Sequence, residues 1–299
     1  MRSRRAKETR NDPIPYRARL PCTHHGPVRA MSGPMAGRLS PEAVEQHGDA
    51  LYAALRRAEA VEPLTAREPT MTIEDAYRIQ QRMIALRTTR DGERVIGKKI
   101  GVTSEAVMNM LNVRQPDFGC LTTAMSFSNG STLDLRTLIA PKAEGEIAFR
   151  LGRDLCGPGV TAADVLAATE AVLPCFEIVD SRIRNWQIRI EDTVADNASS
   201  GAFVLGDEAV DPRGLDLAAV EMNLTKNGAT VVTGNGAAAL GHPANAVAWL
   251  ANTLGQFGIK LAAGEVILSG SLGAMVTVHA GDTLGMTLTG IGSATVSFA

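Results

Sequence analysis

The stretch AEGEIAF, residues 143–149, predicts a β-strand with two chemically different faces. Side chains along a strand point alternately to its two faces. Glu144 and Glu146 therefore lie together on one face, and the glycine and the large apolar residues lie on the other. Two carboxylates side by side on a strand repel each other unless water or a cation screens them. The stretch is therefore either an exposed edge with two solvated glutamates or part of a site for a hard divalent cation.

A second strand that looks buried supplies a third carboxylate. The run VLPCFEIV, residues 172–179, is apolar except for Glu177. A charged side chain in such a strand is costly unless it is paired or bound to a metal. One interpretation is an ion pair with Arg182 or Lys99, and the other is a third metal ligand. Three glutamates, with water at the remaining positions, suit Mg²⁺ or Mn²⁺. No His lies near these acids in the sequence, which disfavours zinc.

Short β-type runs dominate the chain from residue 139 onward. Asn227-Gly228 lies between two of them and is a strong hairpin signal. The predicted strands are 143–151, 173–179, 202–205, 219–226, 229–233, 265–269, 274–278, 283–289 and 294–298. Two helices interrupt them. One begins at the cap pair Thr161 and Asp164, and the other runs from about Pro243 to Gln256.

Helices come first in the chain. Ser40 followed by Pro41 is a helix-start signal, and Thr72 with Asp75 forms a capping-box pattern. Two helices joined by a proline-containing loop are therefore predicted over residues 40–90. The next segment is predicted to hold a short strand at 97–101, a short helix at 104–111 and a turn at 115–119. Early helices followed by a strand-rich second half predict an α+β fold with a large mixed sheet, and not a doubly wound sheet.

Composition and charge narrow the range of partners. The 299 residues are 45% apolar and the formal net charge is −2, so no electrostatic feature favours nucleic acid or an anionic membrane as a partner. No apolar run approaches the roughly 20 residues that span a bilayer. The Arg- and Pro-rich start also lacks the apolar stretch of a secretory signal. We therefore expect a cytoplasmic protein.

The same features predict the domain organisation. Residues 1–38 are expected to be a disordered basic, proline-rich tail, or an artefact of placing the start codon too early. Residues 39–299 are expected to form a single catalytic domain. Its helical part is predicted at 39–92, and a β-roll that carries the metal site is predicted at 93–299.

Three further residues are candidates for proton transfer or substrate contact. Lys99 lies in a glycine-flanked apolar strand, where a lysine either has a lowered pKa or acts as a fixed cation beside an acid. Asp117, in the predicted turn, is a candidate partner for that lysine. Ser199 lies in the segment 190–201, which is dense in small and polar residues of the kind that contact substrates. The alternatives are a surface lysine, an ordinary turn aspartate and a helix-capping segment.

Six blocks of sequence, taken in order, resemble the 2-keto-4-pentenoate hydratases, also called 2-hydroxypenta-2,4-dienoate hydratases, of the fumarylacetoacetate hydrolase superfamily. The resemblance covers residues 40–299. The blocks are GKKIGVTSEAV (97–107), QPDFGCL (115–121), PKAEGEIAF (141–149), EIVDSRIRNWQIRIEDTVADNASSG (177–201), GHPANAVAWLAN (241–252) and AGEVILSGSLGAMV (263–276).

The resemblance implies a fold, a set of site residues and an assembly. The fold would be a mixed β-sheet roll of the fumarylacetoacetate hydrolase C-terminal type, with helices at the N-terminus. The metal carboxylates of the family fall on Glu144, Glu146 and Glu177, and its catalytic positions fall on the candidates Lys99, Asp117 and Ser199. The implied cofactor is Mg²⁺ or Mn²⁺. The implied partners are a small 2-oxo acid as substrate, further copies in a homo-oligomer, and the aldolase that acts next.

The resemblance also implies a reaction, with rivals. A 2-oxo acid chelates the metal, its dienol ketonises and isomerises to a conjugated enone, and water adds at carbon 4 to give 4-hydroxy-2-oxopentanoate. The nearest rival is decarboxylation of 2-oxo-3-hexenedioate (4-oxalocrotonate) on the same fold. Hydrolysis of an acylpyruvate C–C bond needs an early His-Glu pair, for which only His47 is available. A non-catalytic scaffold would not need the three glutamates. We assign no catalytic role to His242 or His279.

Overall fold

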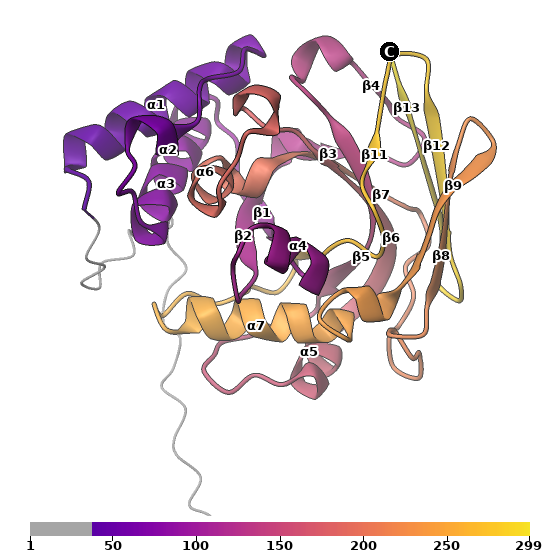
Figure 1. The fold of residues 1–299 in the computed structure, drawn as a ribbon. Coiled ribbons are helices and arrows are strands. Elements are labelled where there is room, and N and C mark those ends of the chain that lie inside the picture. The colour runs from indigo at the N-terminus through magenta and orange to yellow at the C-terminus, as the bar shows by residue number, and fades with distance from the viewer. Residues whose placement is uncertain (1–37) are drawn as a thin grey trace, which may run out of the picture.

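The computed structural model describes residues 38–299, apart from the side chains of Ala106 and Met110. The prediction of a tail therefore lies almost wholly outside the described residues. A layer of helices from the start of the domain packs beside a curled mixed sheet, and a second sheet closes the other side (Figure 1). The α+β class and the early position of the helices are confirmed.

The first layer consists of α1 (Pro41–Arg57), α2 (Leu64–Arg67) and α3 (Ile73–Arg90). The Ser40 hydroxyl accepts from the Ala43 N–H and caps α1, and Thr72 and Asp75 form the predicted capping box of α3. The apolar faces of α1 and α3 bury residues such as Leu51 and Ile79. The sequence did not predict α2. None of the helices in the described part of the chain is long and apolar enough to cross a membrane.

The larger sheet is mixed and carries the site. Its strands are β1 (Val95–Gly101), β2 (Asp117–Thr122), β3 (Ser126–Phe127), β5 (Lys142–Leu151), β6 (Thr169–Val179), β7 (Ser200–Leu205), β10 (Val266–Leu268) and β11 (Val276–Thr277). The order is β2-β1-β10-β5-β6-β7-β3, with β11 paired to β5. Within it, β1 pairs with β10 and β3 with β7 in parallel, and the other pairs are antiparallel.

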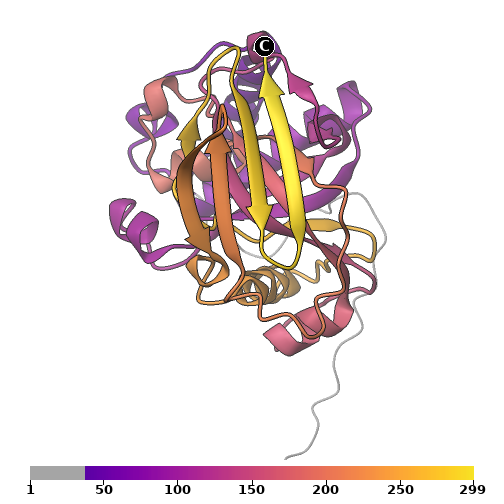
Figure 2. The ribbon, with the colours of Figure 1, turned by 90° about the vertical axis from the view of Figure 1, so that its right-hand side faces the viewer.

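The second sheet covers one face of the first (Figure 2). It runs in the order β4-β13-β12-β8-β9, from β4 (Thr132–Leu133), β8 (Glu221–Lys226), β9 (Ala229–Asn235), β12 (Thr283–Leu288) and β13 (Gly292–Phe298). The predicted hairpin joins β8 to β9. Its turn residues Asn227 and Gly228 have φ of 53° and 85°, the left-handed region that this type of turn requires.

One face of β5 packs on the second sheet, and this decides where the glutamates point. A Cβ atom on Gly145 would lie 2.4 Å from Sδ of Met222 and 2.6 Å from Sδ of Met286. Both methionines belong to strands of the second sheet, so the bare glycine allows the sheets to approach closely. Ile147 and Phe149 share this face and are fully buried in the main core. Glu144 and Glu146 therefore face away from the second sheet.

The remaining helices connect these layers. They are α4 (Glu105–Met110), α5 (Ala162–Ala168), α6 (Ile190–Ala195) and α7 (Pro243–Gly255), with short 3-10 turns η1 (Thr123–Met125), η2 (Leu135–Thr137), η3 (Arg184–Trp186), η4 (Asn197–Ser199) and η5 (Gly236–Ala238). Thr161 and Asp164 form the predicted capping box of α5. Both α5 and α7 lie along the lower side of the sheets in Figure 1.

The prediction of a turn at 115–119 is wrong for its second half. The structure has β2 beginning at Asp117, antiparallel to β1, with Asp117 opposite Gly101 and Gly119 opposite Lys99. Proline and glycine in the segment suggested a turn, but Pro116 only precedes the strand. Gly119 lies within the strand. A glycine is needed there because a Cβ atom at this position would lie 2.4 Å from the backbone oxygen of Asn197. Tertiary contact therefore overrides the local signal.

Candidate active site and metal centre

Three carboxylates converge on the concave side of the larger sheet. Glu144 of β5 lies directly opposite Glu177 of β6 in the antiparallel register, and Glu146 lies two residues further along β5. Residues two apart on one strand share a face, and directly opposed residues share it as well. One carboxylate oxygen from each of the three residues lies within 4.8 Å of the others. The register therefore produces the cluster that the spacing of the acids suggested.

The cluster is buried and short of hydrogen-bond donors. Glu146 and Glu177 are 1% and 0% exposed, and Glu144 is half-buried. Glu146 Oε2 accepts from the Gly270 N–H at 2.8 Å. Among the described residues, Glu146 Oε1 and both oxygens of Glu177 lack a hydrogen-bond donor. Buried carboxylates normally have partners, so these oxygens are available to a ligand that supplies positive charge.

The electrostatics of the three groups fit a divalent cation. Burial, and then the charge of Glu177, raise the pKa of Glu144 to about 7. The same two causes raise the pKa of Glu146 well above its ordinary value. These shifts express the cost of crowding carboxylates together without a counterion. A hard cation with a preference for oxygen ligands would remove that cost, so the donor set fits such an ion.

Lys99 is a fixed cation beside this cluster. Its Nζ lies 3.2 Å from Glu177 Oε1, and it is 3% exposed. The contact is an ion pair without the alignment of a hydrogen bond, which is why Glu177 Oε1 still lacks a donor. Burial alone would lower the pKa of Lys99, but the charges of Glu177, Asp117 and Glu144 outweigh it and raise the pKa. Of the two roles expected for Lys99, the structure supports the fixed cation.

The sequence had suggested Asp117 as the partner of Lys99. In the structure Asp117 lies next to Lys99 but does not form an ion pair with it. Its carboxylate is 2% exposed, and Oδ1 lacks a hydrogen-bond donor among the described residues. Burial raises the pKa of Asp117, and Lys99 opposes the rise. The two side chains converge beside Gly101, where a Cβ atom would lie 2.3 Å from Asp117 Oδ1 and 3.3 Å from Lys99 Nζ. The absence of a side chain at Gly101 makes room for both.

Ser199 lies in a backbone segment of unusual conformation. Asn197, Ala198 and Ser199 have φ of 54°, 50° and 52°, a region that residues other than glycine rarely adopt and seldom three in a row. The Asn197 side chain holds the segment against β2, donating to the Cys120 carbonyl at 2.9 Å and accepting from the Cys120 N–H at 2.8 Å. The Ser199 hydroxyl forms a hydrogen bond with Thr193 at 3.2 Å. Residues 190–201 are thus not one loop, but α6 followed by this strained turn.

The other charged residues considered from the sequence lie elsewhere. Arg182 pairs with Asp196, not Glu177, at 2.5 Å between Nε and Oδ1, and both are fully buried. His242 caps α7 by accepting from the Ala244 N–H at 3.1 Å. His47 pairs with Glu68 at 3.3 Å within the helical layer.

The structure adds residues that the sequence did not single out. Gly270 donates its N–H to Glu146, and its φ of 101° requires glycine. Tyr77 of α3 stacks on Phe118 of β2 with ring centroids 4.6 Å apart, which holds the strand that carries Asp117. The SGS run at 269–271 was a usable signal for Gly270, because glycines between strands mark backbone that approaches a ligand. Nothing local in the sequence pointed to Tyr77.

Comparisons with known proteins identify the relatives of this chain. Residues 81–299 match the family model described as fumarylacetoacetate (FAA) hydrolase C-terminal. The chain is 58% identical over 257 residues to a 2-hydroxyhexa-2,4-dienoate hydratase of Comamonas testosteroni, covering 85% of this chain and 97% of the relative. It is 61% identical over 217 residues to a 2-hydroxypent-2,4-dienoate hydratase of Pseudomonas putida, covering 72% of this chain and 97% of the relative.

A solved structure has the same fold and a related activity. The 4-oxalocrotonate decarboxylase of Pseudomonas putida G7, complexed with magnesium and adipate, superposes with a TM-score of 0.84. It is 36% identical in sequence, and the match covers 87% of this chain and 99% of the decarboxylase. The β-sheet roll and the N-terminal helices are therefore shared with an enzyme of known structure.

Proposed function

The chain belongs to the fumarylacetoacetate hydrolase superfamily and, within it, to the 2-keto-4-pentenoate hydratases, and from this premise we propose how its site works. The protein is a hydro-lyase of aromatic meta-cleavage catabolism that converts 2-hydroxypenta-2,4-dienoate to 4-hydroxy-2-oxopentanoate. The observation that carries the proposed site is the direct opposition of Glu144 and Glu177, with Glu146 beside them, in a chain this similar to hydratases.

The proposed cofactor is one Mg²⁺ or Mn²⁺ ion held by Glu144, Glu146 and Glu177. Support comes from the buried triad oxygens that lack a hydrogen-bond donor among the described residues and from the magnesium in the decarboxylase of the same fold. Oxygen ligands from carboxylates, completed by water and substrate, are what these ions prefer. When bound, such an ion supplies Lewis-acid stabilisation for negative charge on the 2-oxo oxygen of a chelated substrate.

The residues of the chain would handle the protons. Net hydration requires the enol oxygen to lose a proton while carbon 5 gains one, which gives a conjugated 2-oxo-3-enoate. Water then bonds to carbon 4 and loses a proton, and carbon 3 gains one. In our proposal Asp117, whose Oδ1 is buried without a donor, carries protons between these positions. Lys99 stabilises negative charge on the substrate as a fixed cation, and the Ser199 hydroxyl orients the water or the substrate.

The proposal is tested by offering the purified protein two substrates separately in the presence of Mg²⁺ or Mn²⁺. With 2-hydroxypenta-2,4-dienoate we expect 4-hydroxy-2-oxopentanoate and no release of CO₂. With 2-oxo-3-hexenedioate we expect little or no CO₂. Rapid decarboxylation of the hexenedioate without hydration of the dienoate would overturn the assignment in favour of a second candidate, a 4-oxalocrotonate decarboxylase.

That second candidate, the 4-oxalocrotonate decarboxylase activity, rests on the shared fold of the magnesium-bound structure. Its sequence identity of 36% is well below the 58% and 61% of the two hydratases. Both reactions proceed through the same dienolate chemistry, so the triad alone does not separate them. The difference in identity favours hydration.

Assembly and location complete the proposal. We propose a homo-oligomer that can associate with the aldolase of the following step, and a cytoplasmic location, on the basis of the family to which the chain belongs. We also keep the proposed division into a tail at 1–38 and one catalytic domain at 39–299. Gel filtration of the protein alone, and of a mixture with that aldolase, tests the two assemblies independently.

A further inference from the structure

Arg182 is a buried arginine that closely follows β6, the strand of the proposed metal ligand Glu177. Its side chain is 0% exposed and pairs with Asp196, which is also fully buried. The proposed mechanism does not use it. A buried arginine is costly unless its N–H groups have acceptors, so the acceptors that it has found show which part of the chain it holds in place.

The guanidinium bonds to the backbone on both sides of the strained turn Asn197–Ser199. Before the turn, Nη2 donates to the carbonyl of Asp196. After the turn, Nη1 donates to the carbonyl of Ser200 at 2.9 Å. Nη1 also donates at 2.5 Å to the carbonyl of Asp180, the residue directly after β6. One side chain therefore connects the two ends of the strained turn to each other and to the end of β6.

The Asp196 carboxylate fixes the orientation of this guanidinium. Its Oδ1 accepts from Nε of Arg182 at 2.5 Å, and its Oδ2 accepts from the backbone N–H of Arg182 at 2.9 Å. Burial raises the pKa of Asp196 to about 6, and the charge of Arg182 opposes the rise. Arginine suits this place because its planar group supplies several donors in fixed directions, which the single ammonium of a lysine does not reproduce.

The strained turn needs support of this kind because its conformation is unfavourable. All three residues have positive φ, and for Ala198 in particular the left-handed region is disfavoured. The Ser199 N–H donates to the Asp196 carbonyl at 2.9 Å, and the Ser199 carbonyl accepts from the Asp180 N–H at 2.7 Å. Strained backbone persists only where its surroundings over-determine it. Arg182 contributes to this from both ends of the turn.

The strained turn in turn supports the residues proposed for proton transfer. The Asn197 side chain forms two hydrogen bonds with the backbone of β2. Its backbone oxygen packs against Gly119 of the same strand, which lies opposite Lys99 on β1. Asp117 is the first residue of β2. A shift of the turn would therefore move Ser199 directly, and would move Asp117 and Lys99 through the paired strands.

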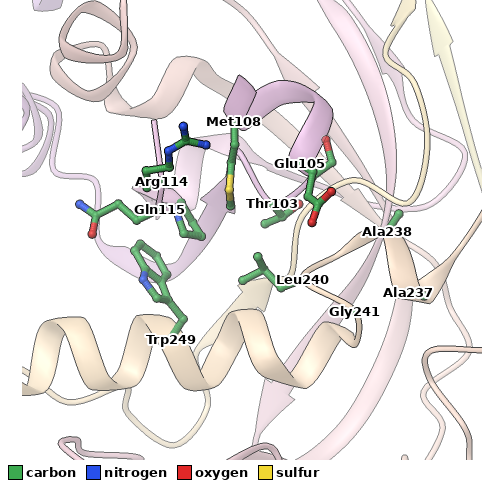
Figure 3. A pocket seen from close by; sticks show the side chains of 12 residues that line it. Thr103, Glu105, Met108, Arg114, Gln115, Ala237, Ala238, Leu240, Gly241 and Trp249 are labelled. Carbon is green, nitrogen blue, oxygen red and sulfur yellow. The ribbon is translucent and has the colours of Figure 1, made fainter. Parts of the chain in front are cut away.

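Arg182 itself does not border the cavity in which a substrate has room. This cavity of about 810 Å³ lies between α4, η5 and α7, and Figure 3 shows Met108 and Trp249 among the side chains that line it. Pro116, the neighbour of Asp117, lines it as well. A concave space of this size is typical of small-molecule binding. Among the described residues that line it, neither Arg182 nor the strained turn is present, so Arg182 can act on a substrate there only through other residues.

We infer that Arg182 is a positioning residue for the hydration: it holds the strained turn in its left-handed conformation, and thereby sets the positions of Ser199 and of the strand that begins at Asp117. The inference rests on the proposed function for the roles of Ser199 and Asp117, and it adds a residue that touches neither substrate nor metal. Loss of Arg182 should lower kcat and leave KM nearly unchanged, because displaced groups of this kind weaken binding of the transition state more than binding of the substrate.

The first test compares Arg182→Lys with Arg87→Lys, assayed on 2-hydroxypenta-2,4-dienoate with Mg²⁺. Arg87 is a second buried arginine, 3% exposed, and its hydrogen bonds go to Glu93 and Thr122 and not to the strained turn. Both variants should unfold at a lower urea concentration than the wild type. Arg182→Lys should lower kcat about 10²-fold, the loss typical of a displacement of about 1 Å. Arg87→Lys should keep the kcat of the wild type.

The second test asks whether Arg182 acts through the conformation of the strained turn. Glycine adopts the left-handed region freely. Ala198→Gly should therefore raise the kcat of Arg182→Lys about fivefold or more, the factor that corresponds to about 1 kcal/mol of left-handed strain in one residue. A residue that contributed only to overall stability would lower the urea midpoint, and glycine at position 198 would not restore kcat.

Hydrogen exchange supplies a measurement that does not depend on activity. The N–H groups of Ser199 and Asp180 form the hydrogen bonds of the strained turn. They should exchange with deuterium faster in Arg182→Lys than in the wild type, whereas the amides that pair β5 with β6 should stay protected. Failure of the wild type to hydrate any dienoate would count against the proposed function, and the exchange rates would still show whether Arg182 holds the turn.

A further variant keeps the test decisive if Arg182→Lys does not fold. Asp196→Asn releases the guanidinium from its ion pair with almost no change of shape, and it should give a loss of kcat of about tenfold or more with the same rescue by Ala198→Gly. Unchanged kcat and exchange in the folded variant, a loss of kcat that Ala198→Gly does not reverse, or an equal loss in Arg87→Lys would overturn the inference.

Discussion

Lys99 Nζ lies 3.2 Å from Oε1 of Glu177, and each of the two residues is at most 3% exposed. Lys99 and the proposed metal ion would thus share the Glu177 carboxylate inside the protein. Lys99 comes from β1 and Glu177 from β6, with β10 and β5 between them in the sheet. The curl of the sheet is what brings the two side chains together (Figure 1). The position of Lys99 links the metal site to the residues proposed for proton transfer.

Lys99→Met should lower turnover of the dienoate strongly without weakening metal affinity. Loss of a group that acts in proton transfer or charge stabilisation typically costs about 10²–10⁴ in rate. The ammonium competes with a metal for Glu177, so its removal should leave metal affinity equal or tighter. Calorimetric metal titration and turnover are measured on the same preparation.

Lys98→Met is the matched control for this experiment. Lys98 is the neighbour of Lys99 on β1, but it pairs with Glu265 at 2.7 Å. It should keep wild-type turnover. If Lys99→Met lost as much metal affinity as the removal of a ligand, the separation of roles would be wrong. If it kept full turnover, Lys99 would be a structural lysine.

Replacement of a triad carboxylate should weaken metal binding. Glu144→Gln and Glu177→Gln each exchange a charged ligand for a neutral amide. Mg²⁺ or Mn²⁺ affinity should fall by at least the roughly 10–100-fold that is typical for loss of an outer-shell partner. Glu170→Gln, an exposed position on the same strand as Glu177, is the control and should bind metal normally. Chelation with EDTA should abolish turnover of the wild type, and added metal should restore it; full activity after exhaustive chelation would refute the metal site.

Gly119→Ala should disturb the strained segment that ends at Ser199. The new methyl carbon would lie 2.4 Å from the backbone oxygen of Asn197, so either strand or turn must move. Overpacking of this kind costs typically about 1–3 kcal/mol of stability, and turnover should fall with it. Gly285→Ala, which would meet only the Thr225 hydroxyl at 3.0 Å, should have a smaller effect on both. Urea unfolding and turnover provide the comparison, and equal effects of the two variants would contradict this account.

The Asp282 carboxylate should stabilise the folded state, and this contribution should decrease as the pH falls. It pairs with Lys226 at 2.7 Å, and it accepts from the Asn227 side chain and the His279 N–H. The hydrogen bond from Lys226, foremost among these contacts, lowers the pKa of Asp282 from its ordinary 3.8 to about 2. A lowered carboxyl pKa stabilises the folded state fully above the unfolded pKa, and this contribution is lost as pH falls towards the folded pKa.

Asp282→Asn should therefore lower stability at neutral pH by roughly 0.2–1 kcal/mol, the range typical of ion pairs near the surface. The difference from the wild type should stay constant from pH 8 to pH 5 and shrink between pH 4 and pH 2. Urea unfolding at each pH measures it. A difference that grew as pH fell would show that the sign of the pKa shift is wrong.

The sequence by itself determined much of the local structure. Alternation along residues 143–149 was sufficient to place Glu144 and Glu146 on one face, because the period of a strand is two and does not depend on its neighbours. The capping boxes at Thr72 and Thr161 and the hairpin at Asn227 were also predictable, since each is formed by residues at most three positions apart. The six blocks identified the family without any structural information.

Only the tertiary structure decided which partners these residues have. The sequence offered two candidate cations for Glu177. In the structure Glu177 pairs with Lys99, whereas Arg182 is buried in an ion pair with Asp196. Asp117 looked like a turn residue but belongs to a strand, because pairing with β1 outweighs the local preference of proline and glycine. The order and register of strands far apart in the chain fix such contacts. That order depends on the packing of the whole core, which no short stretch of sequence encodes.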